Sequence, residues 1–107
     1  MIIRNSAPKN GLRPVHSGEI LREEYLIPLG LSANALSQAL HVPASRINDI
    51  TLERRGVTVD TAMRLVRYFG GDVHSWMNLQ MAYEIKLAEK EKAKRIEREV
   101  MPMLAAA

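Results

Sequence analysis

The chain has 107 residues, a length that supports one domain with one modest hydrophobic core, and its content of 47% hydrophobic and 25% charged residues excludes a disordered or fibrous protein. It contains no cysteine, no long apolar stretch and no apolar leader at its N-terminus, from which we expect neither disulfide bonds, thiolate metal sites nor a membrane span, and a cytoplasmic location. Fifteen basic residues against twelve acidic ones give a net charge of +3, an excess that is compatible with nucleic-acid binding but does not require it.

The first residues carry turn-forming side chains rather than a periodic pattern. Pro8 and Pro14 stand among asparagine, serine and glycine, so residues 1–15 are predicted to be a flexible N-terminal arm. The folded domain is expected over residues 16–100, and a short tail over residues 101–107.

Three helices are predicted in the first half of the domain. Apolar spacing predicts one over 17–28, with Ser17 as its N-cap and a stop at the following proline and glycine. A second is predicted over 32–40, with Ser32 as its N-cap. The third, over 43–51, is expected to begin with Pro43 as its first residue, since proline lacks only an N–H that has no partner there.

Two further helices complete an all-α fold. Thr58 is expected to cap the fourth helix, whose apolar stripe has helical spacing and ends at Gly70-Gly71. Asp72 is expected to cap the fifth, which continues to about Val100. We therefore predict a five-helix bundle of the phage-repressor helix-turn-helix type with an extended C-terminal helix.

The second and third helices have the spacing of a helix-turn-helix, in which the second helix of the pair enters the major groove. Such a pair needs a small residue where the helices touch, which Ser37 supplies, and a left-handed residue in the turn. Glycine is absent there, so we predict a positive φ at His41. The apolar contacts between the two helices are expected from Leu36, Leu40, Val42, Ile47 and Ile50.

The outward face of the helix over 43–51 carries side chains that can read DNA bases. Arginine matches guanine, asparagine matches adenine, and serine bonds to either. The predicted base-reading residues are Ala44, Ser45, Arg46, Asn48 and Asp49. Asp49 has two readings, since its carboxylate is repelled by phosphates: it accepts a hydrogen bond from cytosine, or it pairs with Arg46.

A second group is predicted to contact the DNA backbone. Arg54 and Arg55 precede a glycine in a loop after the reading helix. Ser32 and Asn34 lie at the start of the helix over 32–40, where the first N–H groups of that helix are exposed. Their alternative roles are solvated charge for the arginines and helix capping for the polar pair. The predicted backbone contacts are Ser32, Asn34, Thr51, Arg54 and Arg55.

Six stretches of the sequence resemble the HigA and VapI type of antitoxin, a branch of the Cro and phage-repressor helix-turn-helix family. They lie within about residues 13–100, at 13–21, 42–50, 54–58, 60–65, 68–70 and 76–80. The chain departs from the family pattern at Ser17, where proline is usual, at Ser75, where an aromatic residue usually precedes the tryptophan, and in the pair Gly70-Gly71. None of these departures touches the predicted reading helix.

The resemblance implies a dimer that represses its own operon by binding a palindromic operator in double-stranded DNA, and that neutralises a toxin, typically an mRNA-cleaving ribonuclease. The apolar residues of the fifth helix exceed what the domain needs for its core, so they are predicted to contact a second subunit or another partner. These are Trp76, Leu79, Tyr83 and Leu87. The tail over 101–104 either adds to that surface or folds back on its own subunit.

The sequence argues against an enzyme. Its three histidines are far apart, cysteine is absent and no phosphate-binding glycine loop occurs, so we expect no catalytic residues, metal, cofactor or small-molecule substrate. The main alternative is a protein-interaction module, or a stand-alone regulator without a toxin. For the charged run over 86–99 we expect a solvated helix rather than RNA binding or a coiled coil.

Overall fold

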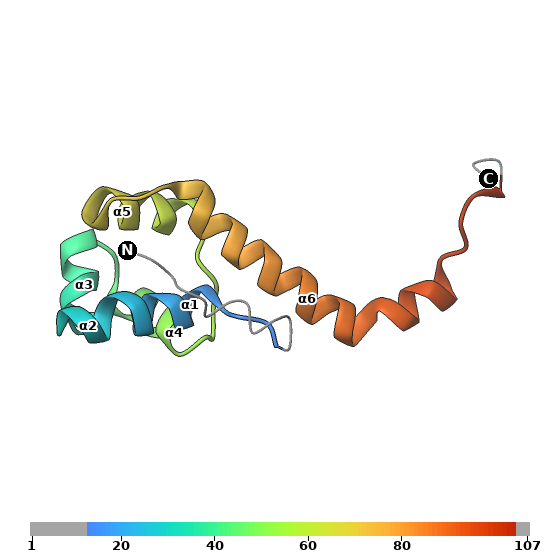
Figure 1. Ribbon diagram of the computed structural model, residues 1–107, viewed down its shortest axis with the longest axis horizontal. Coiled ribbons are helices and arrows are strands. Elements are labelled where there is room, and N and C mark those ends of the chain that lie inside the picture. The colour runs from blue at the N-terminus through green and yellow to red at the C-terminus, as the bar shows by residue number, and fades with distance from the viewer. Residues whose placement is uncertain (1–12, 105–107) are drawn as a thin grey trace.

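A computed structural model describes residues 13–104 (Figure 1). Residues 1–12 of the predicted arm and residues 105–107 of the predicted tail lie outside the described part. Two residues from the end of the predicted arm contact the domain. Val15 packs against the hydrophobic core, and Arg13 forms an ion pair with Glu19 at 2.8 Å.

The first helix is one continuous rod in three segments: α1 (Ser17–Ile20), the π-helical η1 (Leu21–Leu26) and α2 (Ile27–Leu29). It ends at Gly30, whose φ of 62° is left-handed. The prediction that Ser17 caps it was wrong. The cap is His16, because its ring nitrogen Nδ1 accepts a hydrogen bond from the Gly18 N–H at 2.8 Å, while Ser17 is the first helical residue.

The next two helices are α3 (Ala33–Leu40) and α4 (Ala44–Thr51). Ser32 caps α3 as predicted, since its hydroxyl accepts from the Ala35 N–H at 3.0 Å. The positive φ at His41 is confirmed at 57°. Pro43 is the N-cap of α4 rather than its first helical residue, because its ψ of 145° is extended.

The last two helices are α5 (Val59–Phe69) and α6 (Val73–Glu99), with Thr58 and Asp72 as their N-caps, as predicted. α6 begins against the other helices and then leaves them, so that its second half projects away from the domain (Figure 1). The described part of the tail does not pack against the domain, since Met101 is 76% and Leu104 87% exposed. Its predicted alternative of folding back on the same subunit is therefore wrong.

One hydrophobic core holds the helices of the described chain together, and every labelled helix except α2 contributes to it. One buried side chain from α6 is polar. Oε1 of Gln80 accepts hydrogen bonds from the Ser17 hydroxyl at 2.6 Å and from the Val57 N–H at 3.2 Å. The first helix, the loop before α5 and α6 are thereby joined at one atom. The buried apolar residues are Ile20, Leu21, Leu26, Leu36, Leu40, Ile47, Ile50, Val57, Ala62, Leu65 and Trp76.

Candidate nucleic-acid interface

The predicted helix-turn-helix pair is present in α3 and α4. Four of its five predicted apolar contacts are at most 4% exposed, and Val42 is partly buried against the core. Ser37 is 1% exposed, and its hydroxyl donates to the Ala33 carbonyl at 3.0 Å and to the Ala44 carbonyl at 3.4 Å. A larger side chain would separate the helices here, so the serine helps to set how α4 is presented.

The N-terminal half of α4 faces solvent beside the start of α3. Ala44, Ser45 and Asn48 are exposed and line a hollow of about 170 Å³ together with Ala33 and Asn34. The structure therefore brings together three predicted base-reading residues and one predicted backbone contact. Their polar groups are accessible to a ligand that lies across both helices.

Arg46 lies at the flank of this surface, held by a residue of α5. Its Nη1 donates to Oδ2 of Asp60 at 2.9 Å. The same oxygen accepts from Nε of Arg64 at 3.0 Å, and Nη1 of Arg64 donates to the Leu40 carbonyl at the end of α3, at 2.9 Å. The pKa of Asp60 is lowered, first by Arg64 and then by Arg46, so the carboxylate stays charged and orients the arginine.

Asp49 is paired, but not with Arg46 as one of the two readings had it. Its Oδ1 lies 3.2 Å from Nη1 of Arg54, in the loop after α4. The pair neutralises the carboxylate that would repel a phosphate. It also engages one of the two arginines predicted to contact the DNA backbone, while Arg55 is exposed.

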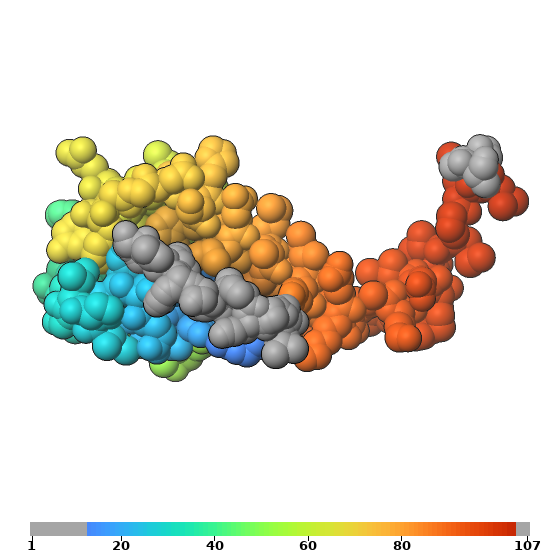
Figure 2. Space-filling view, viewed as in Figure 1, coloured from blue at the N-terminus to red at the C-terminus, as the bar shows by residue number. Residues whose placement is uncertain are grey.

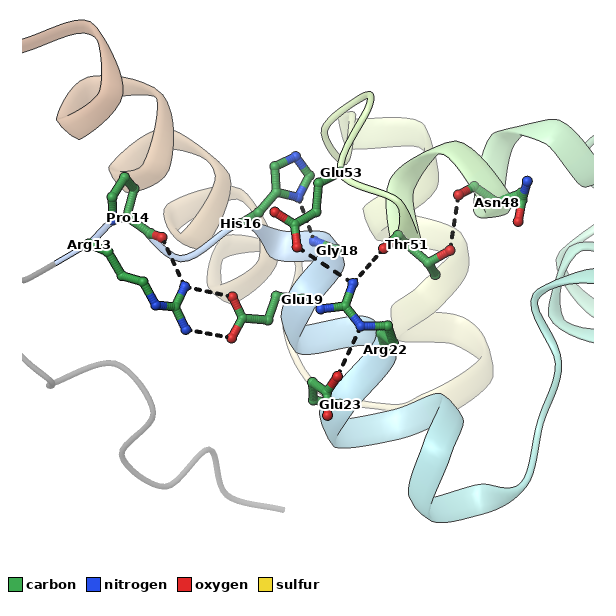
Figure 3. A network of polar contacts seen from close by, with 10 residues as sticks. All are labelled: Arg13, Pro14, His16, Gly18, Glu19, Arg22, Glu23, Asn48, Thr51 and Glu53. Carbon is green, nitrogen blue, oxygen red and sulfur yellow. Dashed lines mark hydrogen bonds and ion pairs between the residues drawn. The ribbon is translucent and has the colours of Figure 1, made fainter. Parts of the chain in front are cut away.

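The end of α4 is fixed to the first helix by Arg22 (Figure 3). Its Nη1 donates to the Thr51 carbonyl at 2.6 Å, so it satisfies one of the carbonyls that a helix leaves open at its C-terminus. Thr51 is one of the residues predicted to contact the DNA backbone, but its side chain is buried. The residue is 7% exposed, and its hydroxyl donates inward to the Asn48 carbonyl at 3.0 Å.

The stripe of α6 predicted to contact a partner faces its own domain. Trp76 is 5% exposed and packs on Tyr25, with ring centroids 5.5 Å apart, and the Tyr83 ring stands edge-on to His16 at 4.7 Å. Leu79 packs against the core and Leu87 is half-buried. Trp76 thus belongs to the core of its own subunit, and contact of the stripe with a partner stays a prediction.

Sequence reasoning missed Asp60, Arg64 and Arg22 as residues that position α4. The spacing of Asp60 and Arg64 is that of an ion pair along one helix, a signal that was available in the sequence. Nothing in the sequence indicates that Arg46 joins them, because that contact depends on how α5 crosses α4. Within residues 13–104, no cluster of metal-ligating side chains occurs and no helix is both long and apolar enough to span a bilayer.

Comparison with known proteins agrees with this geometry. The profile of the helix-turn-helix family matches residues 21–76, which include the α3–α4 pair. The chain is 64% identical over 86 residues to virulence-associated protein I of Dichelobacter nodosus, covering 80% of each protein. It is 30% identical over 77 residues to antitoxin HigA-1 of Vibrio cholerae, covering 72% of each.

Solved structures agree over nearly the same region. The Pseudomonas aeruginosa antitoxin HigA, solved with the higBA promoter, is similar to this chain with a TM-score of 0.80 and 46% identity. The similarity covers 85% of this chain and 99% of that one. It therefore extends beyond the helix-turn-helix pair into α6.

Proposed function

Because the chain belongs to the helix-turn-helix family, we propose that it is a sequence-specific DNA-binding repressor and that α4 reads its operator in the major groove. The observation that carries this proposal is the polar surface of α4, where Ser45 and Asn48 are exposed beside the oriented Arg46. The protein acts as a homodimer on a palindromic site, with its two reading helices about 34–36 Å apart.

The proposed interface divides between base edges and phosphates. Ala44, Ser45, Arg46 and Asn48 face the bases, and Asp49 lies with them as a paired carboxylate. Arg55, Ser32 and Asn34 face the DNA backbone, and Arg54 reaches a phosphate if it releases Asp49. Phosphate contacts fix the position of a protein on the duplex, whereas base contacts carry its specificity.

The similarity to antitoxins extends the proposal to a toxin–antitoxin operon. The similarity to the D. nodosus and V. cholerae relatives spans 80% and 72% of the length of those proteins. The P. aeruginosa HigA was solved with a promoter. This chain represses its own operon and neutralises a toxin of the mRNA-cleaving kind, without catalysis of its own. Co-expression with the product of the neighbouring gene tests this, since an antitoxin restores growth and co-purifies with that product.

A titration of two variants tests DNA reading. Arg46→Ala is expected to cost about 1–3 kcal/mol on the operator and to flatten preference at one base pair, while random duplex is bound as before. Arg55→Ala is expected to weaken operator and random duplex alike, and to lower the slope of log K against log salt by about 0.9 for each phosphate that the arginine no longer neutralises.

Operator DNA, its single-base variants and random duplex at several salt concentrations give the measurement. Equal weakening of every duplex by Arg46→Ala would reassign Arg46 to the phosphates. If wild type shows no salt-dependent, sequence-specific binding, the chain is instead a protein-interaction module.

A further inference from the structure

An open groove of about 530 Å³ lies between α5 and the C-terminal end of α3. Figure 2 shows α5 at the surface, along one edge of the domain. The volume of the groove falls within the range of about 300–1,000 Å³ in which small-molecule sites occur. The groove is separate from the hollow beside Ser45 and Asn48, since the two share no lining residue. It therefore offers a second place where a ligand can bind.

One side of α5 forms a wall of this groove, because the residues that line it recur at helical spacing. The opposite side of the helix, with Ala62 and Leu65, is buried in the core. The groove side is therefore the part of α5 that the core does not use. Its residues are Asp60, Met63, Arg64, Arg67 and Tyr68.

The groove carries an excess of positive charge. Its one carboxylate, Asp60, already accepts hydrogen bonds from both Arg46 and Arg64. The side chain of Arg67 is exposed and forms no ion pair or hydrogen bond with another side chain of the described residues. Residues three apart on a helix have their Cβ atoms about 5–6 Å apart, so the guanidinium groups of Arg64 and Arg67 can reach one anion. A phosphate fits them, because guanidinium pairs with its oxygens in a bidentate way.

The rest of the α5 wall is apolar and includes one aromatic ring. Met63 is 59% and Tyr68 49% exposed. The Tyr68 ring stands edge-on to Phe69, with centroids 5.0 Å apart, so it is held in place while about half of the side chain stays exposed. Aromatic side chains bind nucleobases by stacking on them.

The ring and the arginines are about one helical turn apart. Arg64 and Tyr68 are separated by four residues, or about 6 Å along the helix axis. A ribose spans a comparable distance between its base and its 5′-phosphate. An acidic peptide is a poorer match, because each of its carboxylates carries one negative charge where two guanidinium groups converge.

We propose that this groove binds a nucleotide as a regulatory ligand, with its phosphate between Arg64 and Arg67 and its base on Tyr68. The ligand site itself is independent of the proposed function, but its effect rests on that function. Arg64 holds Asp60, and Asp60 orients Arg46 at the reading surface. A phosphate that draws Arg64 away from Asp60 disturbs this orientation, so the nucleotide weakens binding of the operator.

Isothermal titration calorimetry with the four common ribonucleoside 5′-monophosphates tests the site. At least one is expected to bind wild type with a dissociation constant below about 1 mM, and its nucleoside and inorganic phosphate about tenfold or more weakly. Arg67→Ala is expected to raise the dissociation constant of that nucleotide about tenfold or more, because it removes a charged donor. Arg98→Ala, on the exposed end of α6, is the matched control and is expected to bind as wild type does.

Two further measurements test the groove and its link to DNA. Met63→Asp adds a carboxylate to the groove and is expected to abolish nucleotide binding, with the helical circular dichroism of wild type. Ile27→Asp is its control, because Ile27 is as exposed but lies on α2, away from the groove. Saturating nucleotide is expected to raise the operator dissociation constant of wild type about threefold or more, and linkage requires the operator to weaken nucleotide binding by the same factor.

Three calorimetric outcomes would overturn the proposed site: none of the four nucleotides binds, inorganic phosphate binds as tightly as the nucleotide, or Arg67→Ala binds as wild type does. If no nucleotide binds and Arg67→Ala lowers the salt dependence of DNA binding, the groove contacts the DNA backbone instead. An operator affinity that nucleotide leaves unchanged would overturn the regulatory role. A wild type that binds its operator but no nucleotide keeps the proposed function, so the two failures are distinguishable.

Discussion

The domain and the projecting half of α6 use their apolar residues in opposite ways. In the domain, Leu36, Ile47 and Ile50 are fully buried within one chain. In the projecting half of α6, Ile85 and Ile96 are each 50% exposed. Isoleucine therefore stabilises a single subunit in one region and is available to a second molecule in the other.

The largest expected contrast is in core stability. Leu36→Ala removes a fully buried side chain and is expected to lower the free energy of unfolding by roughly 2–5 kcal/mol. Ile96→Ala is expected to change it by less than about 0.5 kcal/mol when the protein is dilute enough to be monomeric. Urea unfolding of both variants measures the difference, and similar decreases would mean that the projecting half of α6 packs within its own subunit.

Substitutions along α6 test where the helix stops contributing to the stability of the domain. Gln80→Ala leaves the Ser17 hydroxyl and the Val57 N–H buried without their acceptor, so we expect a decrease of about 1–3 kcal/mol in the free energy of unfolding. Lys90→Ala, about three turns further along α6, is expected to change little. Thermal or urea unfolding tests this, and an unaffected Gln80→Ala would show that these hydrogen bonds contribute nothing net.

A substitution of Asp60 tests whether the specificity for operator DNA depends on the domain and not on the projecting helix. Asp60→Asn weakens the bond that orients Arg46, so the ratio of operator to random-duplex affinity is expected to fall about fivefold, or about 1 kcal/mol. Glu91→Gln in the projecting helix should leave that ratio unchanged. Competition binding with both duplexes gives the ratio, and unfolding curves of the Asn variant separate an effect on orientation from an effect on stability.

The smallest expected effect is a pH dependence confined to the domain. Burial lowers the pKa of His16 below its ordinary value of 6.5, against the opposing charges of Glu53 and Glu84. Its contribution to stability is therefore complete above pH 6.5 and is lost as the pH falls through the lowered pKa, because Nδ1 must stay unprotonated to cap the first helix.

His16→Asn provides the comparison, since asparagine caps a helix without titrating in this range. Unfolding free energies of wild type and variant are compared between about pH 5 and 8, and the wild type is expected to lose more stability toward the acidic end. Parallel curves would contradict the role of His16. The projecting helix and tail add no such effect, because residues 81–104 contain no histidine.

Much of the fold was predictable because its signals are local. Ser32, Thr58 and Asp72 cap helices as expected, since a cap is a hydrogen bond between residues two or three positions apart. The left-handed turn at His41 follows from the spacing of two adjacent helices. The cap at His16 was missed, because histidine is not among the usual capping residues and its ring is held by packing against Tyr83.

The candidate DNA-reading surface was predictable in part. Helical periodicity alone sets Ser45 and Asn48 on the outward side of α4, and both are exposed. Periodicity does not give the partners of charged side chains. Asp49 has Arg54 and Arg46 has Asp60, and the second pair exists only because the start of α5 comes to lie beside α4.

The sequence by itself thus determined the number of helices, most of their caps and turns and the helix-turn-helix pair, because each depends on residues close together along the chain. Only the tertiary structure decided which apolar side of α6 the core consumes. A helix with apolar residues on opposite sides has no local preference between them, and the choice is made by what packs against it. Here the first helix and α5 cover Trp76 and Gln80, which leaves Ile85 and Ile96 facing outward.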